Sequence, residues 1–190
     1  MANFLDKVQP KNRMQLEELI DYAFKHNIYD LNFIDTSKIT DMSLLFINCM
    51  HDFDVSGWDV SNAKSIGYIF YKCKNFKGKG IENWDVSNVT DMTHMFSWCN
   101  NFEGKGLEHW NISNVIKTNN MFHECHNFNC DLSKWNVSNI YDTCKMFKEC
   151  KNFEAKGLEN WNLEKIIFCY DMFYGCDKIT IPKWHKKYNF

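Results

Sequence analysis

The feature that most constrains this fold is a motif that returns about every 26 residues through most of the chain. Successive tryptophans of the motif are spaced by 26, 26, 25, 26 and 23 residues. Six cysteines have the spacings 24, 26, 26, 25 and 26, and each follows a phenylalanine by three residues. A period of this length is typical of repeat architectures, in which stacked units share one core. The recurring residues are Trp58, Trp84, Trp110, Trp135, Trp161 and Trp184, with Cys49, Cys73, Cys99, Cys125, Cys150 and Cys176.

The first half of each unit has apolar residues at helical spacing. In "SNVTDMTHMFSWC" the apolar residues are separated by 3, 3, 1 and 3 positions, which places them on one face of a short helix. Ser87 or Asn88 stands ahead of this segment and is a suitable N-cap. The predicted inward face consists of Val89, Met92, Met95, Phe96 and Cys99.

The second half of each unit, "GLEHWNIS", indicates a short strand. Trp110 and Ile112 alternate with polar residues, and Gly104 and Gly106 supply a turn before them. The repeat therefore predicts an α/β repeat solenoid with one short parallel β-strand and one short helix per unit. One unit cannot bury its apolar face alone, so like residues of successive units should stack on one another.

The chain divides into three predicted parts. Residues 1–30 form an N-terminal helical cap, because apolar residues recur at helical spacing from Pro10 to residue 27. Residues 31–184 form about six tandem repeats in one solenoid, and residues 185–190 form a C-terminal tail after a last capping strand. A helix that binds a partner is the alternative interpretation of the N-terminal segment.

Composition excludes several classes of partner. The 190 residues carry 22 basic and 24 acidic side chains, for a formal charge of -2, which gives no electrostatic basis for binding nucleic acid. No run of apolar residues is long enough for membrane insertion. The first residues lack the apolar core of a signal peptide. We therefore expect a cytoplasmic protein or one whose leader has been removed, and the sequence does not separate the two.

Several of these segments also carry a family resemblance. "WDVSNVTDMTHMF", "MFHECHNF" and "DTSKITDMSLLF" resemble the bacterial BspA-like leucine-rich-repeat surface proteins, in their form with a 26-residue WDVSNVTDMxxMF repeat. The resemblance covers residues 31 to 184. It implies a leucine-rich-repeat-like solenoid with a surface-associated, adhesive role, and it brings no catalytic residues.

Candidate chemistry is sparse. We expect the recurring cysteines, together with Cys144 and Cys169, to be core residues, and Cys130 to be the most accessible thiol. "HECH", from His123 to His126, is the one candidate metal cluster, and a solvated surface is the favoured alternative. No nucleophile–base pair stands out, so we predict no enzyme, no cofactor and no metal.

Function is expected on polar columns beside the buried tryptophans. Strand side chains alternate, so the residues on either side of each inward tryptophan should face outward. We expect these columns to contact a protein or host-surface ligand, or only to stabilise the stack, in a monomer or a weakly self-associating chain. A metal-dependent protein that uses "HECH" and a purely structural array are the alternatives. The predicted partner-binding residues are Asn83, Asp85, His109, Asn111, Lys134, Asn136, Asn160 and Asn162.

Overall fold

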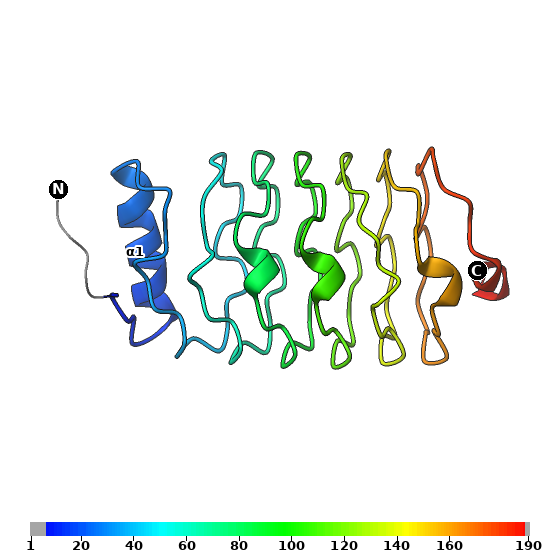
Figure 1. The fold of residues 1–190 in the computed structure, drawn as a ribbon, viewed down its shortest axis with the longest axis horizontal. Coiled ribbons are helices and arrows are strands. Elements are labelled where there is room, and N and C mark those ends of the chain that lie inside the picture. The colour runs from blue at the N-terminus through cyan, green and yellow to red at the C-terminus, as the bar shows by residue number, and fades with distance from the viewer. Residues whose placement is uncertain (1–6, 189–190) are drawn as a thin grey trace.

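A stack of similar coils forms the body of the protein. The computed structural model describes residues 7–188, so residues 1–6 of the predicted cap and 189–190 of the predicted tail lie outside the described part. The coils follow one another along a single axis, with a helix at each end (Figure 1). The elements are α1 (Arg13–Lys25), η1 (Ile81–Asn83), η2 (Leu107–His109), η3 (Leu158–Asn160) and η4 (Lys183–Tyr188), of which the last four are 3₁₀ helices.

Helix α1 covers the first coil. Its N-cap is Asn12, whose side chain accepts a hydrogen bond from the backbone N–H of Gln15. Leu16, Ile20 and Ala23 are buried on its inner face. The following residue, Phe24, contacts the first coil, with ring centroids 6.2 Å from Phe46 and 5.7 Å from Phe53. The helix lies within the segment 10–27, where the sequence pattern predicts one.

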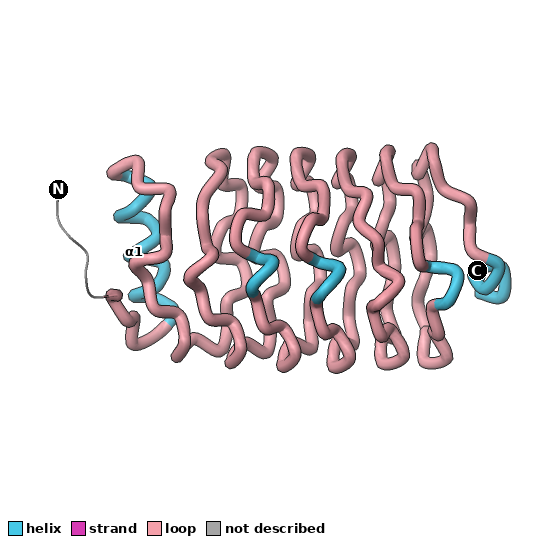
Figure 2. Tube along the Cα trace, viewed as in Figure 1, coloured by secondary structure: helices cyan, strands magenta, loops and turns pink. Residues whose placement is uncertain are grey.

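The predicted α/β repeat solenoid, with one strand and one helix per unit, is wrong. Among residues 7–188 the coils contain turns and isolated parallel bridges but no extended strand, and no α-helix follows α1 (Figure 2). The predicted N-caps have other roles. Ser87 donates its N–H to Asp85, and the Asn88 amide donates to the Ser61 carbonyl of the preceding coil. Five bridges in a row join Asp41, Ser65, Asp91, Lys117, Asp142 and Phe168, which are one coil apart.

Two consecutive β-turns replace the predicted helix. In the third coil, Met95 donates its N–H to the carbonyl of Met92, and Cys99 donates to Phe96. The third residue of each turn has a positive φ, 54° at His94 and 67° at Trp98, which is the pattern of type II turns. The first and last residues of these turns point inward. Their spacing of 3, 1 and 3 is the spacing that a helical face would also have.

The coils are joined by hydrogen bonds from every second residue of the paired turns. In the third coil, His94, Phe96 and Trp98 donate their N–H groups to carbonyls of the fourth coil over distances of 2.7–3.0 Å. The intervening residues bond within their own coil. This alternation satisfies the backbone without regular strands, which is why only isolated bridges form.

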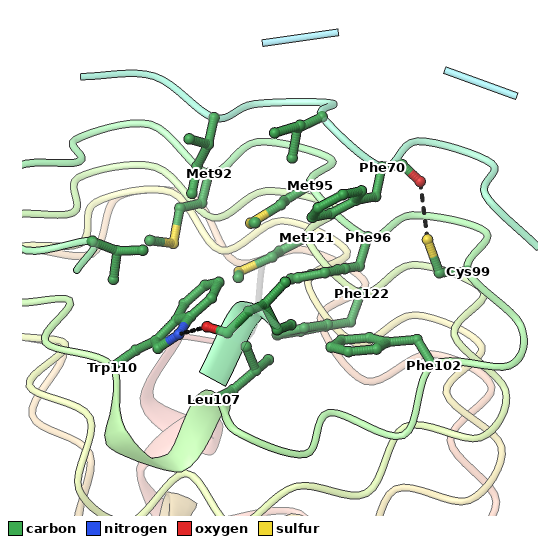
Figure 3. Packing of buried hydrophobic residues seen from close by; sticks show 14 of the residues in the cluster. Phe70, Met92, Met95, Phe96, Cys99, Phe102, Leu107, Trp110, Met121 and Phe122 are labelled. Atoms are coloured by element: carbon green, nitrogen blue, oxygen red, sulfur yellow. Dashed lines mark hydrogen bonds between the residues drawn. The ribbon is translucent and has the colours of Figure 1, made fainter. Parts of the chain in front are cut away.

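Stacked aromatic rings fill the core, as the repeat predicts. Phe96 is fully buried, and its ring centroid lies 5.4 Å from that of Phe70 and 5.8 Å from that of Phe122 (Figure 3). Trp84 and Trp110 stack with centroids 6.4 Å apart and ring planes 9° apart. Each inner phenylalanine of this column therefore contacts its counterparts on both sides, so the core continues from coil to coil.

Buried polar groups also join the coils. The Cys99 thiol donates to the carbonyl of Phe70 at 2.9 Å (Figure 3), and the Trp110 indole N–H donates to the carbonyl of Ile81 at 3.0 Å. The same bonds recur in the neighbouring coils, so the cysteine column supplies hydrogen-bond donors as well as apolar volume. The thiols that donate such bonds are those of Cys73, Cys99, Cys125, Cys150 and Cys176. The indoles that do so are those of Trp58, Trp84, Trp110, Trp135, Trp161 and Trp184.

The segment predicted as a strand, "GLEHWNIS" and its counterparts, instead begins with a single 3₁₀ turn ahead of the tryptophan in three of the coils. At Gly106, the residue ahead of η2, φ is 93°, and an added Cβ would lie 2.6 Å from the Glu82 side chain of the preceding coil. Glycine is needed there for both reasons. At the C-terminal end the predicted capping strand is also wrong, because η4 covers the last coil and stacks Trp184 on Trp161.

Candidate functional site

Each coil presents two sides to solvent. We call the residues beside the buried tryptophans the Trp-side columns. We call the outward residues of the paired turns the turn face. The turn face comprises residues 43–44, 67–68, 93–94, 119–120, 144–145 and 170–171 from the first turns, and 47–48, 71–72, 97–98, 123–124, 148–149 and 174–175 from the second turns.

All eight predicted partner-binding residues are exposed, and they lie in two neighbouring columns. The residue after each of the first five column tryptophans also has a structural role, because its side chain accepts a hydrogen bond from the backbone N–H two residues later. This bond is 3.0 Å long at Asp85 and 3.2 Å at Asn111. Exposed residues of the two columns are Asn83, Asp85, His109, Asn111, Lys134, Asn136, Asn160 and Asn162.

The acceptor column therefore stabilises turns within each coil rather than forming a ladder between coils. The inter-coil amide ladder lies three residues further on, where Asn88 and Asn114 donate to backbone carbonyls of the preceding coil at 2.8 and 2.7 Å. Hydrogen bonds from Ser87 lower the pKa of Asp85, so its carboxylate stays ionised at neutral pH. The other column, with His109 and Lys134, varies in chemistry from one coil to the next.

The turn face carries aromatic and basic side chains. Tyr174 is 61% exposed, and the Lys148 ammonium lies 4.7 Å from the centre of its ring. Lys145 and Tyr170 form a similar pair at 5.4 Å. Such cation–π contacts hold the rings in place while leaving much of their surface exposed.

The centre of the turn face is organised around His94. Its ring stacks on Tyr68 with centroids 4.6 Å apart. Burial, with smaller contributions from His123 and Lys145, lowers the pKa of His94 to about 4, so the ring is neutral at pH 7. Within residues 7–188, the buried His94 Nδ1 and Ser97 Oγ atoms have no hydrogen-bond partner in the protein.

A shallow groove borders the turn face and crosses the coils along the bridge positions. Its polar side chains include Asp91 and Lys117, one coil apart. A hydrogen bond with Tyr141 raises the pKa of Lys117, and the attraction of Asp91 adds to the effect. Small residues such as Gly67 keep the groove open.

The "HECH" segment is divided between the core and the surface. Cys125 is buried and donates its thiol to Phe96, and burial raises the pKa of that thiol. The His126 ring lies 2.8 Å from Glu124 and 3.1 Å from Asn100. In the described part of the chain, no three His, Cys, Asp or Glu side chains are grouped as a metal site would require.

The prediction of Cys130 as the most accessible thiol is wrong. Its side chain is only 7% exposed, and burial, together with the Glu108 carboxylate, raises the pKa of the thiol to about 12. Cys49 and Cys176, at the two ends of the cysteine column, are more exposed. Cys144 and Cys169 are buried, as the sequence predicts.

A comparison with protein families identifies the repeat. The family model described as "Mycoplasma protein of unknown function, DUF285" matches residues 14–104 and 64–185. The chain belongs to this family. The two DUF285 matches overlap, as expected when one model fits a repeated sequence in two registers. At the level of the repeat family, this agrees with the resemblance to BspA-like proteins.

Two further comparisons found no relatives. No curated protein and no solved structure matches this DUF285 chain. Among residues 7–188, no helix has the length and apolar character needed to cross a bilayer.

Sequence reasoning missed the turn face because the outward residues of the repeat were taken as the solvated side of a helix. A signal for them is present in the sequence. Tyr68, His94 and Asn120 occupy equivalent positions, and so do Lys72, Trp98 and Glu124. The inward residues next to them hardly change from coil to coil, so the variation at these outward positions is a signal within the repeat.

Proposed function

We propose that this protein is a non-catalytic recognition module that binds a protein partner through the turn face. The observation that carries the proposal is the contrast between nearly constant inward residues and outward aromatic residues that differ from coil to coil. Tyr71, Trp98 and Tyr174 belong to the residue types that contribute most energy to protein interfaces. The paired turns hold them on a rigid backbone, which lowers the entropy cost of binding.

The proposed partner is a protein or a host surface, and the family supports this choice only in general terms. The chain's motif resembles the 26-residue form of BspA-like surface proteins, for which an adhesive role is expected. The Trp-side columns are a second candidate surface. They are less favoured because Asp85 and Asn111 already accept hydrogen bonds that hold their own turns.

Two sets of substitutions test which side recognises a partner. The protein is first screened on an array of purified proteins to find a saturable binder. One variant then combines Tyr71→Ala, Trp98→Ala and Tyr174→Ala on the turn face. The matched control combines Asn83→Ala, His109→Ala and Lys134→Ala on the Trp-side columns.

The proposal predicts that the turn-face variant loses binding while the control retains it, with both variants still folded by circular dichroism. Loss in the control alone would assign recognition to the Trp-side columns. Binding unchanged in both variants, or no saturable binder on the array, would contradict the proposal.

A further inference from the structure

We propose that the groove beside the turn face binds a linear β-1,4-linked oligosaccharide, with one sugar ring against each coil. The groove is lined by residues of six successive coils, from Ser43 in the first coil to Phe168 in the sixth. It is therefore long and narrow, and it runs parallel to the axis of the stack. An extended polymer whose units advance by the coil spacing would place one unit against each coil.

The spacing of the coils favours a sugar polymer over a peptide. Consecutive parallel bridges join the positions under the groove, so neighbouring coils lie about 4.8 Å apart there. A β-1,4-linked pyranose chain is extended and advances by nearly this distance per ring. Successive rings are turned over by about half a turn, so the same hydroxyl groups return at every second coil, which is also the spacing of Asp91 and Asp142 on either side of Lys117. A peptide strand advances by only about 3.3 Å per residue, so its side chains would lose register within a few coils.

The chemistry of the groove suits a neutral polyhydroxylated ligand. Asp91 and Asp142 lie one coil on either side of Lys117, so opposite charges alternate and no strong field of one sign develops. Asp91 uses one carboxylate oxygen to accept the N–H of Thr93 at 2.9 Å, and its other oxygen remains available as an acceptor. Carboxylate, ammonium and amide groups in one row can hydrogen-bond the vicinal hydroxyls of successive rings.

The walls and floor of the groove are held in place before any ligand binds. The Thr93 hydroxyl donates to the Asn119 side-chain carbonyl at 2.9 Å, which fixes the amide orientation. Tyr68 is held by its stacking on His94. Gly67 leaves the floor open between them, and a Cβ there would lie 3.3 Å from the carbonyl oxygen of Thr93. A site that is already ordered loses less entropy on binding.

This groove is separate from the aromatic residues proposed to bind a protein. The groove shares Gly67, Tyr68, Thr93 and Asn119 with the edge of the turn face. Its charged residues Asp91, Lys117 and Asp142 lie outside the turn face, and Tyr71, Trp98 and Tyr174 do not line the groove. Either proposal can therefore fail while the other stands.

Calorimetric titration with oligosaccharides of increasing length tests the inference. The probes are cellobiose to cellohexaose and chitobiose to chitohexaose, with the curved β-1,3-linked laminarihexaose as the control. We expect affinity to rise with each added ring up to the hexamer in at least one β-1,4 series. The series that binds more tightly shows which ring substituents the groove accepts. No binding by either series, equal affinity for dimer and hexamer, or equal affinity for laminarihexaose would overturn the proposal.

Three variants locate the binding site. Gly67→Tyr introduces the residue that the sixth coil carries at the equivalent position, Tyr170, and should abolish hexamer binding by filling the groove. Asp91→Ala should weaken binding at least about tenfold through the loss of charged hydrogen bonds. Asp85→Ala is the matched control, because it loses the same kind of turn hydrogen bond outside the groove. Binding that survives Gly67→Tyr, or that falls equally in Asp85→Ala and Asp91→Ala, would contradict the site.

Discussion

The Trp-side columns and the turn face use their outward residues in different ways. On the Trp side, Asp85 and Asn111 hold their own turns, so the polar surface there is part of the folded architecture. On the turn face, one repeated outward position is occupied by Tyr68, His94 and Asn120 in successive coils. Backbone hydrogen bonds set the positions of these residues. The comparison shows how a repeated fold can keep the acceptor column after the tryptophans nearly constant and leave the turn face free to vary.

The largest predicted effect concerns the inward residues of the paired turns, behind the turn face. Phe96→Ala removes ring contacts with Phe70, Phe102 and Phe122, whose centroids lie 5.4, 4.2 and 5.8 Å away. We expect the free energy of unfolding to fall by about 3–5 kcal/mol, measured by urea denaturation. Trp98→Ala, two residues away and outward, should cost less than about 1 kcal/mol. Comparable losses would show that the face is needed for the fold and is not free to vary.

The second prediction concerns the protonation of His94 and its effect on the free energy of unfolding. Its pKa is about 4 in the folded protein, below the ordinary 6.5, because of burial and the nearby His123 and Lys145. Between these two pH values the unfolded chain binds more protons than the folded chain. The free energy of unfolding therefore falls as pH drops from 6.5 to 4, by up to about 1.4 kcal/mol per pH unit from this group.

His94→Asn isolates this contribution to the pH dependence. Asparagine occupies the equivalent place in the next coil, at Asn120, with a φ of 56° against 54° at His94. The free energy of unfolding of each protein is measured at pH 7 and at pH 4.5. The wild type should lose more stability than the variant between these two pH values. A difference that is independent of pH would mean that His94 does not titrate abnormally.

Sequence alone predicted the stacked columns but not the local structure that forms them. Tryptophan and phenylalanine recur at a fixed period, and burying them requires stacking whichever backbone is used. The segment from Met92 to Cys99 was predicted as helical because two successive type II turns have the same inward spacing as a helix. The positive φ at His94 and Trp98 distinguishes the two structures, and of these two residue types only histidine is enriched at positive φ.

The remaining misses have equally local causes. Cys130 stands where the chain is one residue shorter between tryptophans, with a spacing of 25 against 26 in the unit before, and this cysteine packs inward. The eight predicted partner-binding residues are exposed, which follows from their position beside inward tryptophans. Whether they bind a partner stays a prediction. The groove was missed because it combines residues from six units, which period alone does not bring together.

The Trp-side acceptors make a smaller prediction. Asp85→Ala removes the acceptor of the Ser87 N–H, and we expect a loss of about 0.5–1.5 kcal/mol in unfolding free energy. Asp85→Asn should retain most of the stability, since Asn111 makes the same bond in the next coil. Urea denaturation of both variants checks this. If alanine and asparagine cost the same, the side-chain bond contributes nothing and the Trp side is as free to vary as the turn face.

The smallest predicted effect is a stabilisation on the turn face itself. Lys72 has a φ of 61°, a strained conformation for a residue with a Cβ, and the equivalent residue of the last coil is Gly175. Lys72→Gly relieves this strain. Glycine also adds entropy to the unfolded chain, and the contact of Lys72 with Tyr71 is lost, so the net gain in unfolding free energy should be at most about 1 kcal/mol.

Lys74→Gly is the matched control. Lys74 is an exposed lysine without a positive φ, so glycine there should destabilise the protein. Thermal denaturation of the two variants should move the midpoint in opposite directions. A shift in the same direction would show that the side chain at position 72 contributes more to stability than its backbone strain takes away.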